Sequence, residues 1–179
     1  AGAGNDVIKF ATDNLTKADS IDGGDGTDTI QSADNAEVVD ADFTLVSNVE
    51  TLSGGATSDL DATIDTLAAA AGITTVTFLH TGASGDSLTV KAGFTNDLTV
   101  NLDDNAAADT NIVDASLYVG SNLVVKTTST NIEGIFRYAK GVVACQGSNI
   151  YYSADGNTWT QVNKDTYQNK TGTVSVTAG

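Results

Sequence analysis

Residues 23–31, GGDGTDTIQ, combine glycines and carboxylates at a spacing that suits the binding of a hard cation. Glycine allows backbone conformations that other residues avoid, so the carbonyl groups of such a turn can point inward. Asp28 adds a carboxylate, and Ile30 is placed to enter an apolar interior two positions later. Calcium takes carboxylate and carbonyl oxygens as its ligands in proteins. The segment therefore predicts a calcium-binding turn that leads into a strand.

A second, imperfect copy of this segment, AGAGNDVIK, occupies residues 1–9. Ala1 takes the place of the first glycine, and Asp6 corresponds to Asp28. Ile8 corresponds to Ile30, and the two copies are 22 residues apart. The sequence thus offers two candidate turns of the same kind.

Both copies resemble the nonapeptide Gly-Gly-x-Gly-x-Asp-x-U-x of calcium-binding parallel β-rolls, in which U is a large apolar residue. Residues 23–31 match it at every fixed position. On this motif the chain resembles the RTX group of secreted bacterial proteins. The wider stretch LTKADSIDGGDGTDTI…DADFTLVSNVETLSG is similar to units of S-layer proteins and large adhesins. The resemblance covers residues 1–54.

In that family, calcium lies between successive turns and is bound by the motif aspartate and by carbonyl groups of the turn. The resemblance therefore implies Ca²⁺ as a cofactor, and it implies a set of ligands. These are the carboxylates of Asp28 and Asp6 and the backbone oxygens of Gly24, Gly26, Gly2 and Gly4, with Asp25 and Asp22 as additional ligands.

The spacing of the two copies departs from the family pattern. Family repeats follow one another every nine residues, whereas these copies are 22 residues apart. Because each calcium ion needs half-sites from neighbouring turns, we expect one or two ions and not a long row. The residues also leave open that GGDGTD forms a tight Asp-Gly turn without a metal.

The amino-acid composition limits the classes of protein to which the chain can belong. The chain has 179 residues and a net charge of −15, which argues against nucleic acid or an anionic membrane surface as partner. Twenty of its 23 acidic residues are Asp, a residue that favours turns. No apolar run approaches the length of about 20 residues that a membrane-spanning helix needs. The chain contains no Met, so we expect either processing or a longer parent protein.

Short apolar runs separated by Gly, Asp and Asn predict a mainly β fold over residues 1–130. Apolar positions such as Leu88, Val90, Leu98 and Val100 recur at intervals that suit the stacked coils of a solenoid. An antiparallel sandwich with tight turns is the open alternative. The predicted strands are 7–10, 29–32, 48–52, 74–79, 87–91, 98–102, 111–113 and 123–127.

One short helix is predicted over residues 58–71, because Leu60, Ile64 and Leu67 form a helical stripe. Ser58 would cap its start, and Gly72 would end it.

The chain changes character after residue 130, where aromatic residues cluster. We therefore predict two domains, 1–130 and 131–179, the second a small four-stranded antiparallel meander. Within it, residues 134–162 include SADGNTW and resemble the Asp-box (BNR) hairpin of β-propeller blades. In those families the hairpin is structural.

The sequence shows no catalytic pattern. His80 and Cys145 are the single His and the single Cys, and no P-loop or dinucleotide-binding motif is present. We therefore expect a non-enzymatic, extracellular structural module of a bacterial surface layer or adhesin that associates with itself into a lattice or fibre, or joins a larger scaffold.

Two alternatives belong to other classes of protein. A phage virion protein, such as a capsid decoration or tail component, would place the chain in a shell on the virion surface. A fragment of a secreted glycan-binding protein could use Tyr151, Tyr152 and Trp159 as a sugar platform.

Overall fold

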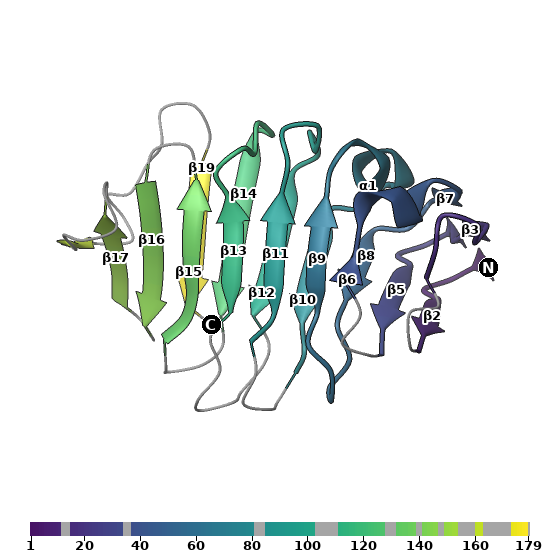
Figure 1. Ribbon diagram of the computed structural model, residues 1–179, viewed down its shortest axis with the longest axis horizontal. Helices are drawn as coiled ribbons and strands as arrows, with labels where there is room; N and C mark the ends of the chain where they lie inside the picture. The colour runs from purple at the N-terminus through teal and green to yellow at the C-terminus, as the bar shows by residue number, and fades with distance from the viewer. Residues whose placement is uncertain are drawn as a thin grey trace.

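A computed structural model describes residues 1–11, 15–33, 37–80, 85–102 and 111–127, and the strand backbones between residues 132 and 178. The chain winds as a coil whose successive turns add strands alternately to two long sheets (Figure 1). The pairing within the coiled part is parallel, so the solenoid is the correct one of the two predicted architectures and the antiparallel sandwich is wrong.

The two long sheets run side by side from the N-terminal end. The first consists of β2 (Val7–Phe10), β5 (Thr29–Ser32), β8 (Thr51–Ser53), β10 (Thr75–Phe78), β12 (Leu98–Leu102), β14 (Asn122–Thr127) and β19 (Thr173–Ala178). The second consists of β6 (Glu37–Val38), β9 (Asp61–Ile64), β11 (Ser87–Val90), β13 (Ile112–Ala115), β15 (Ile132–Tyr138), β16 (Gly141–Gln146), β17 (Asn149–Ser153) and β18 (Thr160–Val162).

Two short strand pairs close a third side of the first coils. β1 (Gly2–Ala3) pairs with β4 (Gly24–Asp25), and β3 (Ile21–Asp22) pairs with β7 (Val46–Ser47), both in parallel. The strands β2, β5 and β12 have the bounds that the sequence predicted.

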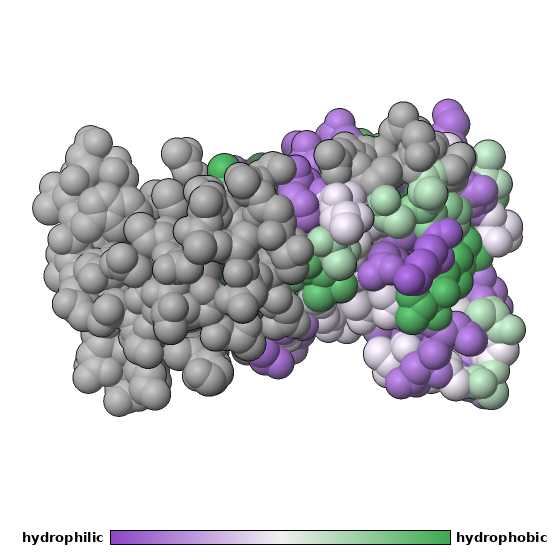
Figure 2. Space-filling view, turned by 90° about the horizontal axis from the view of Figure 1, so that it is seen from below, coloured by the Kyte–Doolittle hydropathy of each residue, from purple (hydrophilic) through white to green (hydrophobic). Residues whose placement is uncertain are grey.

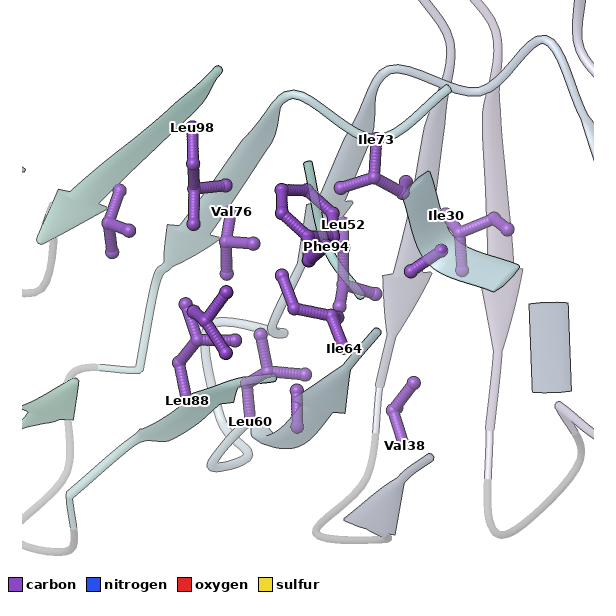
Figure 3. Close-up of a cluster of buried hydrophobic side chains, with 14 of the residues drawn as sticks. Ile30, Val38, Leu52, Leu60, Ile64, Ile73, Val76, Leu88, Phe94 and Leu98 are labelled. Carbon is purple, nitrogen blue, oxygen red and sulfur yellow. The ribbon is translucent and has the colours of Figure 1, made fainter. Parts of the chain in front are cut away.

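The apolar positions of the strands stack in register and fill the space between the sheets. In the first sheet one inner row contains Ile8, Ile30, Leu52, Val76, Val100 and Val125. All except Ile8 are buried. Figure 3 shows Ile30, Leu52 and Val76 of this row in one cluster with Ile64 of β9, Leu88 of β11 and Leu60, which directly precedes β9. The core is thus one continuous column, each coil burying its apolar side chains on the next.

The outward positions of the same strands carry short polar side chains. Thr29, Thr51, Thr75 and Thr99 form one such row in consecutive coils, and each is half-buried. Threonine suits this place because a β-branched side chain packs well on a pleated surface. Seen from below, the described surface mixes hydrophilic and hydrophobic residues (Figure 2).

The helix is shorter than predicted. α1 spans Thr66–Ala71, and the predicted first turns form β9 instead. Leu60, Ala62 and Ile64 alternate as inward residues of a strand, and pairing of β9 with β11 satisfies the backbone. The predicted end is correct, since Gly72 adopts φ 108° and its N–H donates to the carbonyls of Ala68 and Ala69. A 3-10 helix, η1 (Asp40–Phe43), lies beside α1.

Asp40, not Ser58, supplies the cap of α1, and it comes from the preceding coil. Its Oδ1 accepts N–H bonds from Asp65 at 2.7 Å and Ala68 at 2.9 Å, and its Oδ2 accepts one from Leu67 at 3.1 Å. The first N–H groups of a helix have no acceptor within the helix, and here Asp40 supplies the acceptors.

We expect Asp40→Ala to lower the free energy of unfolding by about 1–2 kcal/mol, the usual range for losing a helix cap. Urea denaturation followed by circular dichroism measures the change. Asp40→Asn keeps an acceptor oxygen and is the matched control, which should lose much less. Equal losses in both variants would show that the charge of Asp40, and not the capping bonds, is what matters.

The predicted four-stranded meander is present as β15 to β18, with antiparallel pairing. β15 also pairs in parallel with β13, so the meander continues the second sheet of the solenoid. The two-domain division stays a prediction. The Asp-box turn, residues 154–159 with Trp159, lies outside the described residues. Within the described part of the chain, no helix is both long and apolar enough to span a membrane.

Candidate cation site between the first turns

The two Gly-Asp turns lie directly on top of each other. Gly2 pairs with Gly24 and Ala3 with Asp25. The N–H of Gly2 donates to the carbonyl of Gly23 at 3.2 Å, and that of Gly4 donates to the carbonyl of Asp25 at 2.7 Å. A spacing of 22 residues is therefore one full coil here, so the two copies are neighbours although they are not tandem nonapeptides.

Close stacking explains the glycines of the second turn. Gly24 and Gly26 have φ of 99° and 141°, conformations that favour glycine. A Cβ on Gly24 would lie 2.0 Å from the carbonyl oxygen of Gly2, and one on Gly26 would lie 2.1 Å from that of Gly4. Both the backbone conformation and the space require glycine at these two positions.

Asp28 is the buried carboxylate of the site. The residue is fully buried, and its Oδ1 accepts the N–H of Asp6 at 2.8 Å. Its own N–H donates to Oε2 of Glu50 at 2.8 Å, and its carbonyl accepts from Thr51 at 3.0 Å. These bonds fix Asp28 between the first and third coils. Its second carboxylate oxygen, Oδ2, is buried and has no hydrogen-bond partner within the part of the chain that the structure describes.

Oδ2 of Asp28 lies close to Gly23. We call the space that a side chain on Gly23 would fill the cradle. A Cβ on Gly23 would lie 2.7 Å from this oxygen and 1.8 Å from the carbonyl oxygen of Asn48. A carboxylate oxygen and a carbonyl oxygen therefore converge where Gly23 lacks a side chain. Oxygens of these two kinds are the ligands that calcium takes. The donor set fits a hard cation in kind.

Asn48 is held in an unusual conformation at this place. Its φ is 52°, in the left-handed region that Asn tolerates better than most residues. Its Nδ2 donates to Oδ1 of Asp22 at 2.8 Å. Asp22, an additional ligand in the sequence prediction, thus bonds to the side chain of the residue whose carbonyl oxygen approaches Gly23.

The other predicted ligands are arranged differently. Asp6 meets Asp28 through its backbone N–H, and its half-buried side chain belongs to the first coil. The carbonyls of Gly2 and Gly4 face the glycines of the second turn. Asp25 is exposed, with its carbonyl accepting from Gly4. The roles of these residues as metal ligands stay predictions.

Among the residues that the structure describes, no three His, Cys, Asp or Glu side chains gather closely enough to hold a metal ion. A cation beside Asp28 would therefore depend on backbone oxygens and water for most of its ligands. Calcium accepts such ligands in its flexible shell of about six to eight oxygens.

Sequence reasoning missed Asn48 and Glu50. Glu50 follows Asp28 by 22 residues, as Asp28 follows Asp6, so the spacing of the acids carried this signal. Asn48 stands two residues before Glu50, as Gly26 stands two before Asp28, and both have positive φ.

Aspartates elsewhere also join neighbouring coils by accepting backbone N–H bonds. Asp86 is fully buried, accepts from Leu60 and donates its own N–H to Oδ1 of Asn111 at 2.9 Å. Asp65 accepts from Gly93 at 2.7 Å. Part of the Asp content therefore serves the stacking of coils.

His80 is buried two residues after the end of β10, where its Nδ1 contacts Oδ1 of Asp59. This contact joins the end of one coil to the turn before β9.

Comparison of the chain with protein-family models, curated proteins and solved structures gave no match. The similarities to RTX, S-layer and Asp-box proteins therefore rest on the sequence motifs alone.

Proposed function

We propose that this chain is an extracellular, calcium-binding structural module of a bacterial surface-layer or adhesin-type protein, without enzymatic activity. In this proposal calcium binds beside Asp28 and holds the first coils of the solenoid together. The observation that carries it is the buried Oδ2 of Asp28, which has no hydrogen-bond partner among the described residues; this oxygen and the carbonyl oxygen of Asn48 both lie within 3 Å of the place that a Cβ on Gly23 would take.

The physical reason is the cost of a buried charge. An ionised carboxylate that is removed from water is unfavourable unless it is paired and hydrogen-bonded. Oδ1 of Asp28 accepts the N–H of Asp6, while Oδ2 has no donor among the described residues and lies, with the carbonyl oxygen of Asn48, around the place that a Cβ on Gly23 would take. A divalent cation would satisfy both of these oxygens at once. It would also offset repulsion within a chain whose net charge is −15.

The solenoid suits a structural role. Its coils form one continuous column of apolar side chains, and the aspartates Asp40, Asp65 and Asp86 are used to bond one coil to the next. Such an architecture gains stability from each neighbour and presents long surfaces for association.

We expect calcium to raise the melting temperature of the chain. Extracellular calcium modules bind with a Kd of about 10⁻⁴–10⁻³ M. Calcium at about ten to a hundred times Kd then stabilises by about 1.4–2.7 kcal/mol. For a chain of this length that corresponds to about 3–10 °C. Thermal melts followed by circular dichroism, in EDTA and in a calcium series, measure the shift.

Asp28→Asn is the decisive variant, since it keeps an acceptor for the N–H of Asp6 but removes the charge. It should abolish the calcium response. Asp61→Asn removes one charge from an exposed position of β9 and should keep the response. Identical melting of the unmodified chain in EDTA and in calcium would refute the role of the ion.

A further inference from the structure

The N-terminal end of the solenoid has backbone groups that no neighbouring strand of the described chain covers. β2 and β1 are the end strands of their sheets, and they lie at the outer end of the molecule (Figure 1). Asp6 and Phe10 direct their carbonyls at β5, where they accept from Thr29 and Ala33. Because alternate residues of a strand face opposite sides, the backbone groups of Val7 and Lys9 face away from β5.

The apolar column also continues to this end without a cover. Ile8 occupies the same inner row as Ile30, which is 0 % exposed, yet Ile8 is only partly buried. Phe10 pairs with Ser32 and is likewise only partly buried, although its side chain packs against the core. The first coil therefore presents part of its core-facing surface to the outside.

The glycines of the first turn also lie at this uncovered end. Gly24 and Gly26 must be glycine because the carbonyls of the coil ahead, at Gly2 and Gly4, press against them. Gly2 and Gly4 occupy the equivalent positions, but a Cβ on either would meet no described atom within 4 Å. The φ of 121° at Gly4 favours glycine by itself. Within the described chain, neither the close approach of a neighbour nor a positive φ accounts for Gly2.

The bonds between carboxylates and backbone N–H groups of successive coils also stop at this end. The carboxylate of Asp28 accepts the N–H of Asp6, and the carboxylate of Glu50 accepts the N–H of Asp28. Each acid thus reaches back to the coil before it, by 22 residues. In the same register, the carboxylate of Asp6 would accept an N–H of a coil ahead of the first.

We infer that the N-terminal end, formed by β1, β2 and the turn at Gly4, is a docking face for one further coil. The occupant is an extended peptide segment that runs parallel to β2 and carries the same Gly-x-Gly-x-Asp turn. It pairs with the backbone of Val7 and Lys9, covers Ile8 and Phe10, and sets its glycine carbonyls against the first turn. The contact repeats the one between the first and second coils. It does not depend on calcium, so it goes beyond the proposed function.

The test adds such a coil to the full chain by placing a duplicate of residues 1–22 directly ahead of Ala1. The added glycines and aspartate then stand 22 residues before their counterparts. Hydrogen exchange followed by NMR is measured on the amides of Val7 and Lys9, with and without calcium. We expect at least about tenfold slower exchange of both amides in the extended chain, in EDTA as well as in calcium, because both become paired and buried. The added segment should also resist proteolysis.

Gly2→Ala supplies the control for stacking. In the unextended chain this variant should melt as the parent does, because its Cβ enters open space. In the extended chain it should abolish the added protection, because the new coil would meet that Cβ. A proteolysed extension with unchanged exchange at Val7 and Lys9 would overturn the inference.

A second copy of the chain is the competing occupant. If the unextended chain sediments as a dimer that Gly2→Ala dissociates, a second copy covers this face and the inference of a further coil is wrong. If calcium has no effect on melting but the extension is protected, the proposed function fails and the docking face stands.

Discussion

Replacing Gly23 with alanine should destabilise the first coils by at least about 3 kcal/mol, the upper range for forcing extra atoms into a packed site. The added Cβ would stand 1.8 Å from the carbonyl oxygen of Asn48 and 2.7 Å from Oδ2 of Asp28. The first of these neighbours belongs to the backbone and cannot rotate away. The turn must therefore open, which separates the second coil from the third.

Chemical denaturation followed by circular dichroism measures this loss, and the calcium melt is repeated on the same variant. The calcium response should disappear together with the stability, because the added methyl group fills the cradle beside Asp28. Gly2→Ala is the matched control. It adds the same methyl group where no described atom lies within 4 Å, and it should change stability by no more than about 0.5 kcal/mol. A Gly23→Ala chain as stable as its parent would mean that Asn48 does not approach Gly23.

The β character of the chain and several of its strands were predictable because local residue patterns indicate them. Val7–Phe10 and Thr29–Ser32 each follow a turn rich in Gly and Asp and place an isoleucine at the second position, and both form strands with the expected bounds. The choice between solenoid and sandwich was not predictable. It depends on which strands pair across a whole coil, and no local pattern distinguishes a parallel neighbour from an antiparallel one.

The stretch before α1 shows where periodicity is ambiguous. Leu60 and Ile64 fit a helical stripe, but with Ala62 they fit the alternation of a strand equally well. Pairing of β9 with β11 on one side and with β6 on the other stabilises the strand over the helix. Tertiary contacts of this kind override local preference, and they leave only Thr66–Ala71 as helix.

The candidate site was predictable in its centre and not in its surroundings. Asp28 and the glycines follow from the motif, and the structure places them at the contact of two coils. The cradle oxygen of Asn48 depends on a three-dimensional approach of the third coil to Gly23. A motif read along the chain contains no information on that approach.

Truncation of Leu52 to alanine is expected to cost about 2–5 kcal/mol, the range for removing a fully buried leucine. Leu52 is 0 % exposed and stands in the inner row between Ile30 and Val76. In a solenoid each coil is stabilised mainly by its two neighbours. A cavity at Leu52 therefore weakens the contacts to both sides of the column, and the coils on either side should lose cooperativity.

Ile8→Ala is the matched control, because Ile8 occupies the same row in the end coil and is only partly buried. With one neighbouring coil and part of its side chain outside, it should cost about 1 kcal/mol, well below the range for full burial. Urea denaturation of both variants measures the difference. Equal losses at the two positions would contradict an open end and would mean that another chain already covers Ile8. In the chain extended by residues 1–22, the cost of Ile8→Ala should rise toward that of Leu52→Ala, because the added coil gives Ile8 its second neighbour.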